Sequence, residues 1–287
     1  NLKGEDGVTP LHIAASSGNE EAVKVLIGAK ASLNLKDESG STALHQAIAN
    51  KHLPIVKLLI DTKGVDLEAR DNTLATALIV ATKIQFLEAV AALLEKDVKL
   101  DSGDERDYTA AHHAAESGQL AILQVLASKG ASLDAVSLAD HSYTPLHVAA
   151  NAGCLEIVAF LIDNGASADS GDDTTPLHCA ARIGNVKVLE KMLEKGGDVN
   201  VTDLNMATPL HIAASSNQVE AATLLVTRGA KLEEADYLGA TPFLVAAQHG
   251  CLELVKYLAS QGANVSALDK SKASALHRAA SNSSAAI

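Results

Sequence analysis

The sequence predicts an all-α protein built from repeated helix pairs, and three observations support this fold class. A seven-residue string recurs as TPLHIAA at residues 9–15, TPLHVAA at 144–150, TPLHCAA at 175–181 and TPLHIAA at 208–214. Looser copies begin at Thr42, Thr76, Thr109, Thr241 and Ser274. Successive copies start 33, 34, 33, 35, 31, 33, 33 and 33 residues apart. Apolar residues follow each string with a helical period, and so regular a repeat is typical of stacked supersecondary units.

Each string has the features of a helix start. Its threonine suits the N-cap, where the hydroxyl accepts a hydrogen bond from an otherwise unpaired backbone N–H. A proline such as Pro10 fits the first helical position, because no hydrogen bond is lost there and its φ is already helical. The Leu-x-x-Ala-Ala segment then forms a narrow apolar face that allows close helix packing.

A second helix is predicted after a short turn in each repeat. The turn contains glycine in five copies, at Gly18, Gly118, Gly153, Gly184 and Gly250. The apolar periodic segment that follows is exemplified by residues 156–162. Other glycines stand where this helix should end, in the place of a left-handed C-cap: Gly130, Gly165, Gly196, Gly229 and Gly262. The predicted unit is therefore helix, turn, helix and polar loop.

The chain resembles the ankyrin repeat family throughout its length, because the period and the T-P-L-H-x-A string are those of that family. The resemblance implies a solenoid of stacked antiparallel helix pairs, with connecting loops that project as β-hairpin fingers. One pair cannot bury its own apolar face, so neighbours share a core. We expect a single array over residues 1–287, with repeats at about 4–36, 37–70, 71–103, 104–138, 139–169, 170–202, 203–235, 236–268 and, in part, 269–287.

Composition excludes several other classes of protein. The 287 residues include 23 Lys and Arg against 35 Asp and Glu, a net charge of −12, which argues against nucleic acid as a partner. Apolar residues make up 47%, so intrinsic disorder is not expected. No apolar stretch approaches the ~18 residues of a membrane span, and we expect no membrane insertion.

The chain has the cysteine usage of a protein from a reducing compartment. Three cysteines are too few for a disulfide scaffold. The chain begins at Asn1 without a methionine or the basic and apolar regions of a signal peptide, and it looks like an excerpt of a longer protein. We expect a cytoplasmic location, with the nucleus as the alternative.

Departures from the repeat pattern carry further predictions. The third copy, at residues 76–82, lacks the proline and the histidine, and Gln85 and Asp97 replace expected glycines. This copy is either a hinge, at which the first three repeats open before the rest, or an ordinary degenerate repeat held by its neighbours. The spacings of 35 and 31 predict a longer finger near 134–143 and a shorter one near 169–174.

The histidines invite a metal-binding interpretation that the repeat geometry disfavours. Seven of the eleven belong to the motif: His12, His45, His112, His147, His178, His211 and His277. Packed helices lie ~8–10 Å apart, whereas zinc needs nitrogen ligands at ~2.0–2.1 Å. The family resemblance instead implies that they bridge a helix start and the neighbouring finger by hydrogen bonds. His113 and Glu116 could share a helix face, but no third ligand is adjacent.

Catalysis has no support in the sequence. Cys154 and Cys251 occupy matching positions three repeats apart, roughly 30 Å at that packing distance, far beyond the ~7 Å Cα separation of a disulfide. Cys179 lies within a helix motif and is interpreted as a small buried hydrophobe. We therefore expect no enzyme, no cofactor and no metal.

Acidic residues gather before the fourth, fifth and sixth repeats. They are Asp101, Asp104, Glu105, Asp107, Asp134, Asp140, Asp169, Asp172 and Asp173. Three interpretations stay open for this rim: a merely solvated face, a surface for a basic partner, or a calcium site. The segment 101–107 lacks the twelve-residue arrangement of an EF-hand.

Tyrosines mark candidate contacts on the fingers. Tyr108 and Tyr143 each stand one residue before a capping threonine, at equivalent positions of adjacent fingers, and Tyr237 lies on the eighth finger. Such rings either offer a large amphipathic contact to a partner or fold back on the finger stems. The residues after each Ala-Ala pair are expected to face a concave groove.

The favoured function is non-enzymatic protein binding through fingers and groove, as a segment of a larger intracellular scaffold, adaptor or effector. We expect a monomeric array within a longer chain that binds a protein partner with a basic surface. The alternative is a structural spacer or elastic arm in a multidomain protein. The candidate partner-binding residues are Glu105, Arg106, Tyr108, His113, Glu116, Asp140, His141, Tyr143, Asn151, Asp172, Arg182 and Tyr237.

Overall fold

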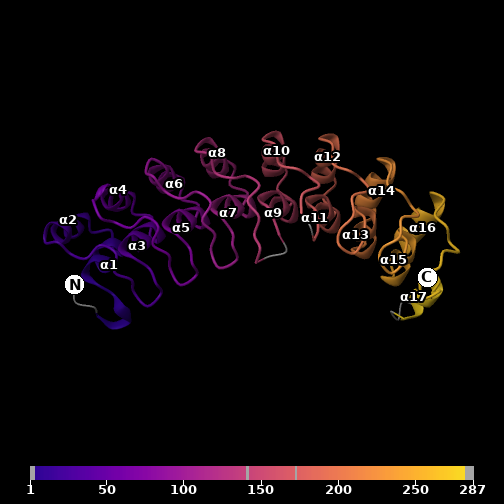
Figure 1. The fold of residues 1–287 in the computed structure, drawn as a ribbon, viewed down its shortest axis with the longest axis horizontal. Coiled ribbons are helices and arrows are strands. Elements are labelled where there is room, and N and C mark those ends of the chain that lie inside the picture. The colour runs from indigo at the N-terminus through magenta and orange to yellow at the C-terminus, as the bar shows by residue number, and fades with distance from the viewer. Residues whose placement is uncertain (1–3, 140–141, 172, 282–287) are drawn as a thin grey trace. The chain divides into compact units, whose positions relative to one another are not determined.

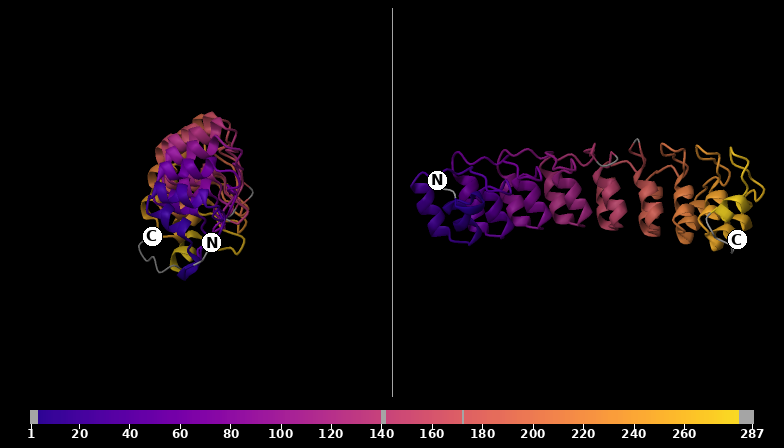
Figure 2. Two further views of the ribbon diagram at one scale, coloured as in Figure 1. Left: turned by 90° about the vertical axis from the view of Figure 1, so that its left-hand side faces the viewer. Right: turned by 90° about the horizontal axis from the view of Figure 1, so that it is seen from below.

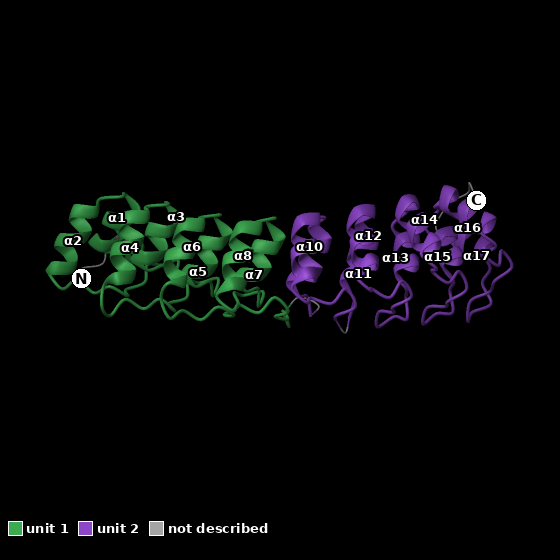
Figure 3. Cartoon of the chain, turned by 90° about the horizontal axis from the view of Figure 1, so that it is seen from above, with its two compact units in different colours: residues 1–140 green, residues 141–287 purple. Residues whose placement is uncertain are grey.

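A computed structural model describes residues 4–139, 142–171 and 173–281. Within these ranges the chain forms seventeen α-helices and one short 3-10 turn, η1 (Glu5–Gly7). The helices belong to two compact units, residues 1–140 and 141–287 (Figure 3). The expectation of an all-α repeat fold is confirmed. That all repeats form one continuous array stays a prediction.

The first unit contains four helix pairs arranged in two layers. Its helices are α1 (Pro10–Ser16), α2 (Glu20–Gly28), α3 (Ala43–Ala49), α4 (Leu53–Asp61), α5 (Ala77–Lys83), α6 (Leu87–Leu94), α7 (Ala110–Glu116) and α8 (Leu120–Ser128). The first helices of successive pairs, α1, α3, α5 and α7, pack on one another in sequence order. The second helices do the same in the other layer (Figure 1).

The second unit repeats this arrangement with four pairs and a final single helix. Its helices are α9 (Pro145–Ala152), α10 (Leu155–Asp163), α11 (Pro176–Ile183), α12 (Val186–Glu194), α13 (Pro209–Ser215), α14 (Val219–Thr227), α15 (Pro242–Gln248), α16 (Leu252–Ser260) and α17 (Ala275–Ser281). The helix pair of one repeat packs on the next. The small residues of the motif allow this, since Ala213 and Ala214 are fully buried between neighbouring helices.

In five repeats the motif histidine ties the repeat to the next one, as the family resemblance implied. In α13, Nδ1 of His211 accepts from the backbone N–H of Thr208 at 3.0 Å and lies 2.9 Å from its hydroxyl. Because Nδ1 is an acceptor, Nε2 carries the proton and donates to the carbonyl of Ala240 at 3.0 Å. The residue before the next capping threonine is thereby held. Four equivalent bonds run from His12 to Ser41, His45 to Ala75, His147 to Thr174 and His178 to Ala207.

The fingers between repeats are tight turns rather than paired strands. The term finger is used here for the five residues that begin with an aspartate and end before the capping residue. Fingers 2, 3 and 4 are residues 37–41, 71–75 and 104–108; fingers 7, 8 and 9 are residues 203–207, 236–240 and 269–273. In the described part of the chain, extended pairing is limited to single bridge residues at Ser137 and Tyr143. Within each unit the fingers project along one edge of the helices (Figure 2).

An aspartate closes each of these fingers. In finger 7 the N–H of Asp203 donates to the carbonyl of Ala207 at 3.0 Å. The carboxylate Oδ1 of Asp203 accepts from the N–H groups of Asn205 at 2.8 Å and Ala207 at 2.9 Å. The same pair of side-chain bonds is made by Asp37, Asp71, Asp104, Asp236 and Asp269. The finger backbone is therefore fixed whatever side chains it carries.

Two repeats that depart from the sequence pattern, the third and the sixth, keep the repeat fold in different ways. The sixth finger is shortened as predicted, because Nε2 of His147 reaches Thr174, 27 residues on, whereas His178 reaches Ala207, 29 residues on. In the third repeat Gln85 adopts a left-handed φ of 58° in place of glycine. Helix α5 packs on both α3 and α7. The boundary between the two units follows Asp140. Residues 140 and 141 of the connection near 134–143 lie outside the described residues, so the longer finger there stays a prediction, as does a hinge at the third repeat.

Candidate protein-binding surface

In finger 4 the closing aspartate has a second partner. Oδ1 of Asp104 accepts from the N–H groups of Arg106 at 3.0 Å and Tyr108 at 3.1 Å. Its Oδ2 lies 2.8 Å from Nε2 of His113 on α7. The side chains of Asp104 and His113 are each 3% exposed. The finger is therefore fastened to its own repeat by a buried polar link.

His113 is consequently a positioning residue of the finger and not an exposed contact, which corrects the sequence expectation. Burial lowers the pKa of His113, because the imidazolium is disfavoured away from water, and the hydrogen bond to Asp104 opposes this only in part. His113 as a whole is only 2% exposed, so a partner cannot reach its ring. Its Nδ1 lies 3.7 Å from Glu116.

Tyr108 also departs from the expected exposed ring. It is 3% exposed and stacks on His112, with ring centroids 4.9 Å apart and planes inclined by 21°. The guanidinium carbon of Arg106 lies 4.1 Å from the centre of the tyrosine ring. Of the two interpretations that the sequence left open, folding back on the finger stem is the correct one for Tyr108.

The accessible part of the first unit's candidate set is a charged rim. Glu105 and Asp107 are exposed. Arg106 approaches Glu116 through two nitrogens, at 3.2 and 3.5 Å, with both side chains more than 40% exposed. A surface pair of this kind contributes only ~0–1 kcal/mol to stability. This ion pair therefore contributes little to folding, and its exposed side chains can serve recognition.

In the second unit, Tyr143, Asn151 and Arg182 form a polar group. The half-buried Tyr143 ring stacks on His147 at 5.1 Å with an interplanar angle of 7°. Arg182 donates to Oδ1 of Asn151 at 2.7 Å. Partial burial raises the pKa of the Tyr143 hydroxyl, while hydrogen bonding to Asn151 and Arg182 partly opposes the rise. The phenol is thus neutral at physiological pH.

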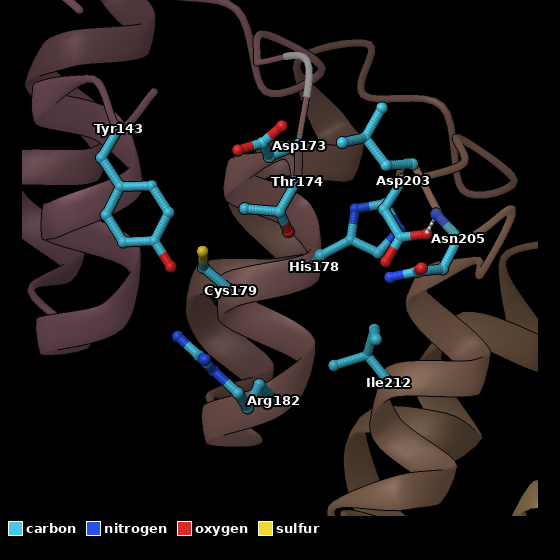
Figure 4. A pocket seen from close by; sticks show the side chains of 10 residues that line it. Tyr143, Asp173, Thr174, His178, Cys179, Arg182, Asp203, Asn205 and Ile212 are labelled. Carbon is cyan, nitrogen blue, oxygen red and sulfur yellow. Dashed lines mark hydrogen bonds between the residues drawn. The ribbon is translucent and has the colours of Figure 1, made fainter. Parts of the chain in front are cut away.

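A pocket of about 420 Å³ opens beside this group (Figure 4). Its lining includes Tyr143, Asp173, Cys179, Arg182, Asp203 and Ile212. The Tyr143 hydroxyl and the Arg182 guanidinium both point toward Cys179 in the close view. Burial raises the pKa of the Cys179 thiol to about 11, so the sulfur is protonated and not a nucleophile. The interpretation of Cys179 as a small buried hydrophobe is confirmed.

The residue nine positions after the finger aspartate differs between fingers 4 and 7. In finger 4 this residue is His113, which occupies Oδ2 of Asp104. Gln46 does the same for Asp37 at 2.8 Å. In finger 7 the equivalent residue is Ile212, which has no donor, and no described residue bonds Oδ2 of Asp203. The carboxylate edge of finger 7 therefore faces the pocket.

Of the remaining candidates, one is exposed and three lie outside the described residues. Tyr237 is 52% exposed, as a finger contact requires. Asp140, His141 and Asp172 lie outside the described residues. Tyr108 belongs to the first unit and Tyr143 to the second. That the two residues lie on adjacent fingers therefore stays a prediction.

Sequence reasoning missed the apolar side chains on the neighbouring fingertips. Leu204 and Met206 on finger 7 are 67% and 54% exposed, and Leu238 on finger 8 is 46% exposed. A signal was available in the sequence. Alignment of the fingers on their aspartates places Leu204 where other fingers carry Glu38 or Glu105, and Met206 where finger 4 carries Asp107.

The described residues contain no group of three or more His, Cys, Asp and Glu side chains that could hold a metal ion. All three cysteines are free thiols. None of the described helices is long and apolar enough to cross a membrane.

Stacked helix pairs with outward-facing fingers define a class of repeat protein. In this class the helices and the finger backbone repeat, while the side chains on the fingers differ from repeat to repeat. The chain belongs to the ankyrin repeat family: the family model described as "Ankyrin repeats (3 copies)" matches residues 1–71, 63–137, 134–203, 184–269 and 210–287. A similar solved structure is the crystal structure of the human ASB11 ankyrin repeat domain. The two sequences are 27% identical, and the structures match with a TM-score of 0.68. The match covers 78% of this chain and 99% of that chain. No curated protein matches the sequence.

Proposed function

We propose that this chain is a non-enzymatic protein-binding module that acts within a larger intracellular scaffold, adaptor or effector. Ankyrin repeats are general protein–protein interaction modules. The proposal includes a monomeric array, located in the cytoplasm or alternatively in the nucleus. The observation that carries it is the pocket beside Arg182, open at the fingers of the second unit.

The pocket has the size and chemistry of a side-chain receptor. A volume of about 420 Å³ accommodates one or two side chains of a partner. Arg182 supplies a planar donor suited to a carboxylate or a carbonyl, while Ile212 and Tyr143 supply apolar walls. The protonated thiol of Cys179 provides no reactive group. These features support recognition rather than turnover.

The first unit contributes a different surface to the proposed function. Glu105 and Asp107 are exposed at the tip of finger 4, and Glu116 lies on the adjoining helix face. Their charge favours a partner segment with basic residues, through long-range attraction that is strongest at low salt. Rim charges of this kind influence the association rate more than the final affinity.

The test is a selection from a phage-displayed library of random 16-residue peptides against the whole 287-residue chain. We expect enriched peptides whose affinity, measured by fluorescence anisotropy, falls at least tenfold in Arg182→Ala. Lys187→Ala is the matched control, because Lys187 is an exposed cation on α12 outside the pocket. Failure to enrich any peptide would favour the spacer alternative. Equal affinity for both variants would remove the pocket from the binding surface.

A further inference from the structure

Two adjacent fingers of the second unit carry an exposed apolar surface. Leu204 and Met206 lie on finger 7, and Tyr237 and Leu238 lie on finger 8. Their exposed fractions run from 46% to 67%. We call these four residues the fingertip patch. Single exposed apolar residues are common on protein surfaces, but a contiguous group on neighbouring elements indicates an interaction site.

Backbone hydrogen bonds organise the fingertip patch without a partner. The N–H of Tyr237 donates to the carbonyl of Asn205 at 2.8 Å, which joins finger 7 to finger 8. The aspartates Asp203 and Asp236 each hold two further N–H groups of their own finger. A preorganised surface loses less conformational entropy when a partner orders it. The patch is therefore suited to tight contact despite its position on loops.

The backbone at Met206 has the left-handed conformation of the finger turn. Its φ is 57°, in the left-handed region, and the equivalent residue of finger 8 is Gly239 with a φ of 79°. A methionine in this conformation costs energy that glycine avoids. Since its side chain is 54% exposed, burial within the fold does not offset this cost. The left-handed φ recurs at this position in every finger, including Leu74, Asp107 and Lys272, so it belongs to the finger turn and only the exposure of the methionine supports a role in binding.

The charges beside the patch specify the partner's chemistry. Finger 9 follows finger 8 and presents Lys270 and Lys272, both exposed. The N–H of Lys270 donates to the carbonyl of Leu238 at 3.0 Å, which places this finger against the patch. The carboxylate of Asp269 is occupied by its own finger and by Arg278 at 2.7 Å. In the described chain Lys272 has no acidic partner.

We infer that the fingertip patch binds a partner segment with large apolar side chains followed by carboxylates. The apolar side chains would cover fingers 7 and 8, and the carboxylates would pair with Lys270 and Lys272 on finger 9. This inference rests on the proposed function and names the chemistry of a partner that it leaves open. It differs from the basic partner favoured by the acidic rim of the first unit.

The test uses the same phage-displayed peptide library on the whole chain, with two additional variants. Leu204→Ser combined with Met206→Gly removes apolar contact without adding backbone strain. Lys270→Glu combined with Lys272→Glu reverses the charge. We expect enriched peptides to pair large apolar residues with Asp or Glu. Their affinity should fall at least tenfold in either double variant, and the melting temperature of the Leu204→Ser, Met206→Gly protein should not fall.

Four outcomes contradict the inference alone. The first is that the enriched peptides lack acidic residues, and the second is that they bind both double variants as well as the original chain. The third is that charge reversal leaves the affinity unchanged. The fourth is that the chain forms a concentration-dependent dimer, which the Leu204→Ser, Met206→Gly change dissociates. The last outcome assigns the patch to a second copy of the chain. Peptides that respond to Arg182→Ala but not to the double variants would leave the proposed function intact, whereas no enrichment at all would contradict both.

Discussion

Finger 4 in the first unit and finger 7 in the second share one backbone design and differ in what surrounds it. Both are closed by an aspartate that accepts from the residues two and four positions ahead. In finger 4 the same aspartate is fastened to His113, and the tip carries Glu105 and Asp107. In finger 7 the second carboxylate oxygen faces a pocket, and the tip is apolar.

This difference separates the folding role of a finger from its recognition role. The bonds from the aspartate to its own backbone recur in six fingers and do not depend on the intervening side chains. The residue nine positions on ties finger 4 to its helix through His113, whereas finger 7 has Ile212 at this position and a pocket beside it. A repeat can therefore change its binding chemistry at few positions without loss of its frame.

The largest effect should come from removing the aspartate in the fastened finger. Asp104→Ala deletes two backbone contacts and leaves His113 buried without its acceptor, so we expect the free energy of unfolding to fall by ~3–4 kcal/mol. Asp203→Ala deletes two contacts in a half-buried site and should cost ~1–2 kcal/mol. Urea unfolding of each variant gives the comparison. Equal losses would mean that the link to His113 adds nothing.

Acidification should weaken both units through their buried histidines. Burial lowers the pKa of His45 and His113 in the first unit and of His178 and His211 in the second. Below the ordinary histidine pKa of ~6.5, the unfolded chain therefore binds protons that the folded chain does not. The stability contribution is complete above that pH and is lost as the pH falls. Urea unfolding at pH 7.5 and pH 5.5 should give a lower free energy at pH 5.5, and an equal or higher value there is inconsistent with neutral buried rings.

The smallest effect concerns the strained tip of finger 7. Met206→Gly relieves a left-handed φ of 57° and loses little burial, so we expect stabilisation of up to ~1 kcal/mol. Gly239→Ala, at the equivalent position of finger 8, should shift stability in the opposite direction. Thermal unfolding of both proteins provides the measurement. A destabilised Met206→Gly protein would show that the methionine side chain contributes to folding after all.

The repeat architecture could be predicted from the sequence because its determinants are local. The threonine caps, the small residues of the first helix and the spacing each act within one repeat or between neighbours. The deletion in the sixth finger was likewise predicted, and the bond from His147 to Thr174 confirms it. The bridging role of the histidines followed from the family resemblance rather than from spacing.

The candidate site was predicted less well, because side-chain exposure depends on contacts between residues that are distant in the motif. Tyr108 and Tyr143 have the same position relative to their caps. Both rings stack on a motif histidine, but only Tyr108 is buried, and Arg106 lies over its ring. The burial of His113 depends on Asp104, nine residues earlier. The repeat pattern assigns Leu204 only to a connecting loop, and its 67% exposure at a fingertip is seen in the structure.

Amide hydrogen exchange of Tyr108 and Ala207 tests the central claim most directly. Both N–H groups donate to the closing aspartate of their finger, at 3.1 and 2.9 Å. If the link from Asp104 to His113 fastens finger 4 while finger 7 stays open to its pocket, the Tyr108 amide should exchange more slowly than the Ala207 amide. His113→Ala should remove most of that difference. Equal protection in the original chain, or a difference that survives His113→Ala, would contradict the account.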